Sequence, residues 1–125
     1  MDDWTTMKRT AVAALWLLGS MTAHAQATRE FPIAGAGSAT CQQWLDRSVG
    51  STDEAMMASW VQGFLSGANS YRYVAYHKDL LLLPEVGDLV ARVSIYCIKN
   101  PNNLLFNASV RVFKILEESA PRREH

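Results

Sequence analysis

The chain has 125 residues, of which 49% are hydrophobic and 19% are charged. Twelve Lys and Arg balance twelve Asp and Glu, so the formal net charge at pH 7 is zero. A neutral chain offers no strongly basic surface for nucleic acid or an anionic membrane, and its composition therefore argues against both partners.

The first 25 residues have the features of a secretory signal peptide. Two bases precede an apolar run over residues 11–18, and "AHA" ends at Ala25. We expect cleavage after Ala25, with Ala27 as the alternative, and we expect Met7 to be the natural start because acids are unusual ahead of such a run. The run is too short to cross a bilayer of about 30 Å, which predicts export to the periplasm with no permanent membrane anchor.

The remainder of the chain divides by composition into an arm, a domain and a tail. Residues 26–40 are aperiodic and rich in Ala, Gly, Ser and Thr, which predicts a flexible arm. Residues 41–119 show helical periodicity and no alternating strand, and predict one small all-α domain, a four-helix bundle. Residues 120–125 are charged and are expected to form a frayed tail.

Start signals define the first two helices. Thr40 is the predicted N-cap of a short helix over residues 41–47. Ser51 followed by Glu54 has the form of a capping box, which predicts a long second helix over residues 52–73.

The third and fourth helices are predicted from prolines. Pro84 suits the first turn of a helix, where its missing N–H is not needed, and the third helix is expected to follow from it. Asn100 is the predicted cap of the fourth helix, with Pro101 as its first residue and an end near Ser119.

The long second helix carries two stripes. An apolar stripe at spacings of three and four predicts its core face: Met57, Trp60, Val61, Phe64, Ala68 and Tyr71. A stripe of small residues recurs every fourth position: Ala55, Ser59, Gly63 and Gly67. Each glycine inside a helix costs about 1 kcal/mol relative to Ala, so the small stripe predicts close packing, either against a neighbouring helix or against a second subunit of a dimer.

Catalytic and metal-binding patterns are weak. His77 is the only histidine after the predicted cleavage site apart from the terminal His125, so no histidine-rich metal site can be assembled. Three acids are scattered over a loop and a helix start: Asp79, Glu85 and Asp88. Ser66 in "GFLSG" lacks the glycine spacing and the preceding strand of a hydrolase nucleophile. We therefore expect no enzyme activity, no metal and no cofactor.

The two cysteines, Cys41 and Cys97, are interpreted as one disulfide. They lack CxxC spacing and are too few for a zinc site, and small exported domains commonly depend on such a bond. A free catalytic thiol is the alternative, but no partner histidine is in view. Closing a loop of this length stabilises the folded state by about 4 kcal/mol in the chain-entropy model.

Two motifs around the cysteines carry a family resemblance. "TCQQWLDRS" (40–48) and "YCIKNPNNLLFNAS" (96–109) resemble the HdeA/HdeB family of small periplasmic acid-stress chaperones, HdeB more closely. The resemblance spans about residues 40–109 and implies an all-helical fold with a Cys41–Cys97 disulfide. It also implies a homodimer that loosens in acid and holds unfolding client proteins on apolar surface. The candidate apolar core or client-binding residues are Trp60, Val61, Phe64, Val93, Leu105 and Val112.

A second hypothesis comes from another class of exported helical proteins. Immunity proteins of the Tai type also combine a helical fold with disulfides, and they neutralise cell-wall amidases delivered by rival bacteria. The stripe from Ala55 to Gly67 would then support an enzyme-blocking surface or a rigid dimer. The chain lacks the additional cysteine pair of that group, so the chaperone hypothesis ranks first, and a structural subunit of the envelope ranks third.

Overall fold

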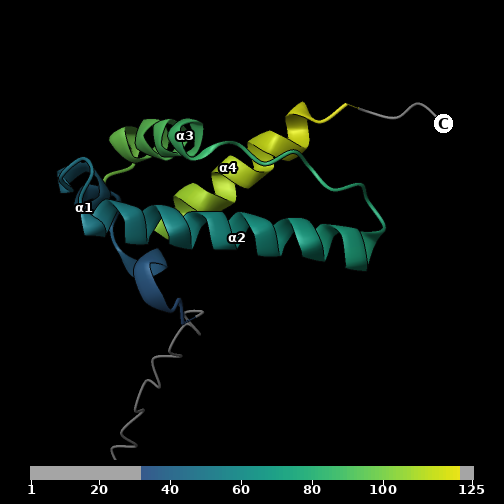
Figure 1. Ribbon diagram of the computed structural model, residues 1–125, viewed down its shortest axis with the longest axis horizontal. Coiled ribbons are helices and arrows are strands. Elements are labelled where there is room, and N and C mark those ends of the chain that lie inside the picture. The colour runs from purple at the N-terminus through teal and green to yellow at the C-terminus, as the bar shows by residue number, and fades with distance from the viewer. Residues whose placement is uncertain (1–31, 122–125) are drawn as a thin grey trace, which may run out of the picture. The chain divides into compact units, whose positions relative to one another are not determined.

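The computed structural model describes residues 32–121 (Figure 1). A 3₁₀ helix, η1 (Gly35–Ser38), is followed by four α-helices: α1 (Cys41–Asp46), α2 (Thr52–Tyr76), α3 (Val86–Lys99) and α4 (Leu105–Ser119). No strand occurs within residues 32–121, and the predicted all-α class is confirmed. The predicted signal peptide and residues 122–125 of the predicted tail lie outside the described residues.

The helices pack around α2 and α4. α2 is the longest element, α4 crosses it obliquely, and α3 lies against α4 (Figure 1). α1 packs mainly on α3, and η1 packs on α2 and α4. An extended segment over residues 77–85 returns from the end of α2 to the start of α3 (Figure 1).

α1 begins as predicted, at a reciprocal cap. The Thr40 hydroxyl accepts a hydrogen bond from the Gln43 backbone N–H at 3.1 Å, and the Gln43 side-chain oxygen accepts from the Thr40 N–H at 2.8 Å. This capping box satisfies two backbone donors at the helix start. The Cys41 N–H donates to the Asn103 carbonyl at 2.7 Å, which attaches α1 to the turn between α3 and α4.

α2 starts at the predicted residue and ends later than predicted. The Ser51 hydroxyl accepts from the Glu54 N–H at 3.2 Å, which confirms the N-cap. The helix continues three residues past the expected end at Tyr73 and stops at Tyr76. The next residue, His77, adopts the left-handed conformation with φ 52°, which ends the helix.

Both proline-based helix starts were wrong. α3 begins at Val86 with Glu85 as its N-cap, so Pro84 lies before the helix. Asn100 ends α3 instead of starting α4, because its side-chain amide donates to the Tyr96 carbonyl at 2.9 Å. Pro101 lies in the turn that follows.

α4 begins at Leu105, four residues after Pro101. The Asn107 side-chain oxygen accepts from the Leu104 N–H at 3.0 Å and supplies the cap that Asn100 was expected to provide. The start of α4 is also joined to the other end of the domain, since the Leu105 N–H donates to the Ala39 carbonyl at 2.8 Å.

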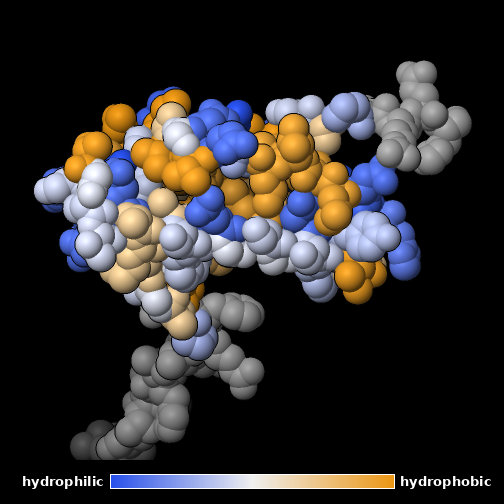
Figure 2. Space-filling model, viewed as in Figure 1, coloured by the Kyte–Doolittle hydropathy of each residue, from blue (hydrophilic) through white to orange (hydrophobic). Residues whose placement is uncertain are grey.

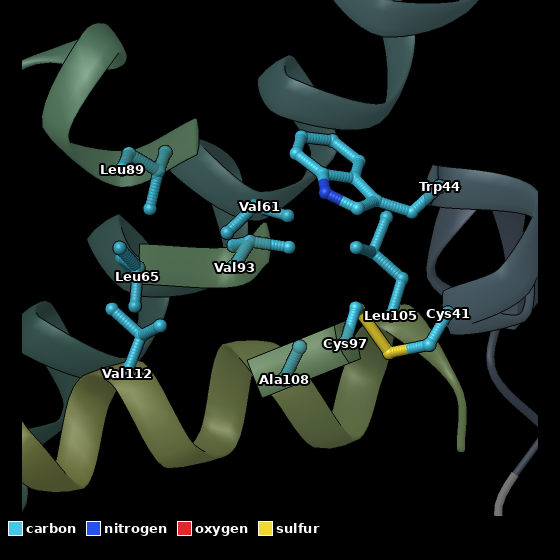
Figure 3. Packing of buried hydrophobic residues seen from close by; sticks show 10 residues of the cluster. All are labelled: Cys41, Trp44, Val61, Leu65, Leu89, Val93, Cys97, Leu105, Ala108 and Val112. Atoms are coloured by element: carbon cyan, nitrogen blue, oxygen red, sulfur yellow. A yellow bond between two sulfur atoms is a disulfide. The ribbon is translucent and has the colours of Figure 1, made fainter. Parts of the chain in front are cut away.

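The core forms where α1, α2, α3 and α4 meet, around the disulfide Cys41–Cys97 (Figure 3). The pairing of the two cysteines is confirmed. The buried apolar residues of this cluster are Cys41, Trp44, Val61, Leu65, Leu89, Val93, Cys97, Leu105, Ala108 and Val112. The Trp44 indole N–H donates to the Ser94 hydroxyl at 3.0 Å, which satisfies the one polar atom of that side chain.

The buried face of α2 is rotated from the predicted one. Its buried residues are Ala58, Val61, Leu65 and Asn69. The predicted stripe contributes only Val61 to this face, and Tyr71 is 63% exposed. The other tyrosines at the end of α2, Tyr73 and Tyr76, are exposed as well.

Residues 34–40 of the predicted flexible arm are folded against the helices. Gly37 of η1 is buried against the indole of Trp60, so closely that a Cβ built on Gly37 would lie 2.1 Å from Trp60 Cζ2. The Trp60 indole N–H donates to the Ala34 carbonyl at 2.9 Å. Residues 34–40 are therefore part of the domain, because a glycine lets the backbone approach the tryptophan ring.

Candidate functional site

The polar candidates of the sequence do not form a catalytic centre. No cluster of three metal-ligating side chains exists within residues 32–121, and both cysteines of that segment are in the disulfide. The Ser66 hydroxyl donates to the Gln62 carbonyl of its own helix. His77 is exposed and is the C-cap of α2, and Asp88 pairs with Arg92 one turn later in α3.

The stripe of small residues on α2 faces solvent. Ala55, Ser59, Gly63 and Gly67 are all exposed. A Cβ built on Gly63 or Gly67 meets nothing within 4 Å. Close packing against a helix of the same chain, one of the two interpretations of the stripe, is therefore wrong for residues 32–121, and the dimer face stays a prediction.

The six candidate apolar residues divide into a buried group and an edge group. Four belong to the closed core: Val61, Val93, Leu105 and Val112. Trp60 and Phe64 are partly buried beside it, with stacked rings whose centroids are 5.8 Å apart. In the folded domain these side chains hold elements together.

Other apolar side chains are exposed in the folded domain. They lie at the end of α2, on the segment after it and on α3: Tyr71, Tyr73, Val74, Tyr76, Leu80, Leu82, Val86, Ile95 and Ile98. Figure 2 shows hydrophobic surface over the extended segment between α2 and α3. Of the residues at the end of α2, only Tyr71 was placed on the predicted core face, and the exposed surface around it was not expected from the sequence.

Two exposed tyrosines at the end of α2 interact. The rings of Tyr71 and Tyr76 meet edge to face, with centroids 5.6 Å apart. A hydrogen bond to the Tyr76 side chain, together with repulsion between the two phenolates, raises the pKa of Tyr71 above its ordinary value of 10.0. Tyr71 therefore remains neutral at physiological pH.

An ion pair ties the start of α2 to α1. Arg47 Nε lies 2.8 Å from Glu54 Oε2, and the two side chains are only 9% and 19% exposed. The Arg47 guanidinium also donates to the Trp44 carbonyl at 2.6 Å and lies 3.7 Å from the centroid of the Trp44 ring. Glu54 additionally accepts from the Gly50 N–H at 3.3 Å. One carboxylate thus holds the turn between the two helices.

A second ion pair ties the far end of α2 to α4. Arg72 Nε lies 3.2 Å from Glu117 Oε2, and the Arg72 guanidinium also donates to the Asp79 carbonyl. Beside this pair is a cleft of about 950 Å³ between the extended segment and the end of α4, lined by residues that include Leu81 and Leu116. Arg72 therefore joins three parts of the domain at the edge of a cleft.

Sequence patterns do not identify either of these two ion pairs. Arg47 and Glu54 are seven residues apart across a turn, and Arg72 and Glu117 are 45 apart, so no local spacing indicates either pair. Asn69 was also missed, although it continues the helical spacing of the buried Val61 and Leu65 and could have been found from that register.

This geometry defines a small all-helical domain with one internal disulfide. The sequence profile of the HdeA/HdeB family matches residues 9–107, and the chain belongs to that family. No curated protein and no solved structure matches the chain significantly.

The family is one of acid-stress chaperones of the periplasm, which act on unfolded proteins and form dimers, and it is not an enzyme family. Among residues 32–121, no helix combines the length and the apolar character needed to span a membrane.

Proposed function

We propose that this chain is an exported chaperone that forms a homodimer at neutral pH, loosens in acid and holds unfolding proteins on apolar surface. Membership in the HdeA/HdeB family supports the class of function. The observation that carries the proposal for this chain is the chemistry of α2: both ion pairs that join it to other helices depend on a glutamate, Glu54 or Glu117.

Acid weakens ion pairs that depend on a carboxylate, because a protonated carboxylic acid carries no charge to attract an arginine. Without that charge, Arg47, whose side chain is only 9% exposed, has no counter-charge, and the joint between α1 and α2 is destabilised.

The disulfide directs which part of the domain opens. It joins α1 to α3 and does not involve α2, so α1 and α3 stay linked in acid. The net charge of the chain, zero at pH 7, becomes strongly positive, and the resulting self-repulsion favours separation of the helices. Release of α2 would expose its buried face, Val61 and Leu65, together with Trp60 and Phe64.

The test measures client protection by the oxidised protein at pH 7 and pH 2.5. We expect acid to convert the dimer to monomer, increase the binding of a hydrophobic dye and keep an acid-unfolded client protein soluble. Absence of protection at pH 2.5 refutes the chaperone function. Inhibition of a cell-wall amidase, without any protection, would support the immunity hypothesis instead.

A matched pair of variants tests the role of α2. Glu54→Gln with Glu117→Gln cuts both ties at pH 7 and is expected to bind the dye and the client at neutral pH. The control, Asp88→Asn with Glu118→Gln, removes the same number of carboxylates from pairs that lie within α3 and within α4. Equal dye binding by the two variants would show that acid does not act through the ties of α2.

A further inference from the structure

The extended segment over residues 77–85, here called the strap, lies against the domain along one edge. Its leucines alternate: Leu80 and Leu82 are exposed, and Leu81 and Leu83 are half-buried. Alternation of this kind is typical of an extended chain, in which successive side chains point to opposite faces. The strap therefore has a half-buried pair of leucines, here called inward, and an exposed pair, here called outward. Leu80 and Leu82 of the outward pair also border the cleft beside the strap.

The strap is recognised through its backbone. The Asn69 side-chain amide donates to the Leu81 carbonyl at 2.9 Å, and its oxygen accepts from the Leu81 N–H at 2.8 Å. Asn69 is 7% exposed, so this amide has been withdrawn from water to bind the strap. Arg72 binds the carbonyl of Asp79, two residues before Leu81 and thus on the same edge of an extended chain.

These contacts do not depend on the sequence of the strap. Every residue except proline has the N–H and C=O that Asn69 binds at Leu81, and every residue has the carbonyl that Arg72 binds at Asp79. The side-chain requirement is also general, because Leu81 borders the open cleft that Leu116 lines, and Leu83 packs on the edge of the core.

The strap is held loosely compared with the helices. No backbone-to-backbone hydrogen bond joins residues 80–84 to another residue of the described segment 32–121. One side of the strap borders the cleft of about 950 Å³, so it is not enclosed by packed side chains. Segments with few backbone bonds and few buried contacts are those that open at low free-energy cost.

We propose that the strap is a built-in occupant of a peptide-binding groove, and that an extended, leucine-containing segment of an unfolding protein replaces it on Asn69 and Arg72. The inference rests on the proposed chaperone function, since it names what part of a client is bound and where. The strap fills the groove in the folded domain. Its displacement leaves the Asn69 amide free for the client backbone, and it frees the apolar surface contacted by Leu81 and Leu83 for the client's leucines.

The test weakens the attachment of the strap by substitution and measures whether the protein then binds the strap sequence as a separate peptide. In Leu81→Ser with Leu83→Ser, the inward leucines are removed and Asn69 is retained. The probe is a labelled synthetic peptide with the sequence of residues 78–86, added at pH 7. We expect this variant to bind the peptide at least about tenfold more tightly than the wild type does.

The outward leucines provide the matched control. Leu80→Ser with Leu82→Ser changes composition in the same way but retains the half-buried Leu81 and Leu83, and it is expected to bind the peptide no better than the wild type. Adding Asn69→Ala to the inward variant is expected to weaken peptide binding about tenfold, the loss of one to two hydrogen bonds. Equal binding by the inward and outward variants, both folded by circular dichroism, overturns the proposal.

Hydrogen exchange of the wild type decides the matter if the inward variant does not fold. The amides of residues 80–83 are expected to exchange by local opening, at least about a hundredfold faster than those of Leu65 and Val93 in the core. Exchange of the strap amides only through global unfolding refutes a detachable strap.

The two proposals fail in different ways. If the wild type protects clients at pH 2.5 but the inward variant binds no peptide, the chaperone function stands and the groove is refuted. If the inward variant binds the peptide and the wild type protects no client, the groove stands and the chaperone function is refuted.

Discussion

Glu54→Gln is expected to weaken the joint between α1 and α2 at neutral pH. The glutamine keeps an oxygen for the Gly50 N–H but replaces a charge-assisted bond to Arg47 with a neutral one. Hydrogen bonds to charged groups contribute about 1.5–3 kcal/mol and neutral ones about 1 kcal/mol, so the expected loss is about 0.5–2 kcal/mol. The pair is only 9% and 19% exposed, and solvent and salt therefore screen it little.

Urea unfolding followed by tryptophan fluorescence measures this loss, at one fixed protein concentration because a dimer would make stability concentration-dependent. The difference from wild type is expected at pH 7. The control is Glu118→Gln, whose carboxylate lies 3.9 Å from Arg111 with both side chains more than half exposed. Such surface pairs contribute about 0–1 kcal/mol. Equal losses in Glu54→Gln and the control would refute the reasoning.

Three further predictions concern the staple, the small stripe and the tyrosine pair. Opening the disulfide by replacing both cysteines with serine is expected to lower the free energy of unfolding by about 4 kcal/mol, since the bond closes a loop with a sequence separation of 56; an unchanged urea midpoint would contradict this. Gly63→Ala and Gly67→Ala are each expected to stabilise α2 by about 1 kcal/mol in dilute protein, because the added methyl group meets nothing; destabilisation would instead reveal a partner packed on the stripe, as a dimer requires. Tyr76→Phe is expected to bring the pKa of Tyr71 back down toward 10.0 in an ultraviolet titration, since the hydrogen bond that raises it is removed; a titration that does not move would exclude that bond.

Helix starts that depend on local signals were predicted correctly, and those that depend on contacts with other elements were not. Thr40 and Ser51 were identified correctly as N-caps because a cap acts within three residues of itself. Pro84, Asn100 and Pro101 misled for the opposite reason. Each is compatible with a helix start, but Asn100 bonds backward to Tyr96, and the turn after it is occupied by contacts to α1.

The candidate site was predicted in part. Four of the six apolar candidates are in the core, since burial follows from residue type and helical spacing. Asn69 and Arg72 were not named, and Glu54 was named only for a capping box, because the importance of these residues depends on which groups of other elements they meet. The exposed aromatic end of α2 was missed because the apolar periodicity of a helix does not show which of its turns another element covers.

The sequence by itself determined the fold class, the disulfide and the family. These depend on composition, on periodicity and on two short motifs around the cysteines, all of which are local properties of the chain. Only the tertiary structure decided which face of α2 is buried, that its small-residue stripe is exposed, and that Arg47 and Arg72 tie it to the rest of the domain. Those outcomes depend on how far each helix extends and on what lies opposite it, and contacts between residues 45 positions apart leave no trace in local spacing.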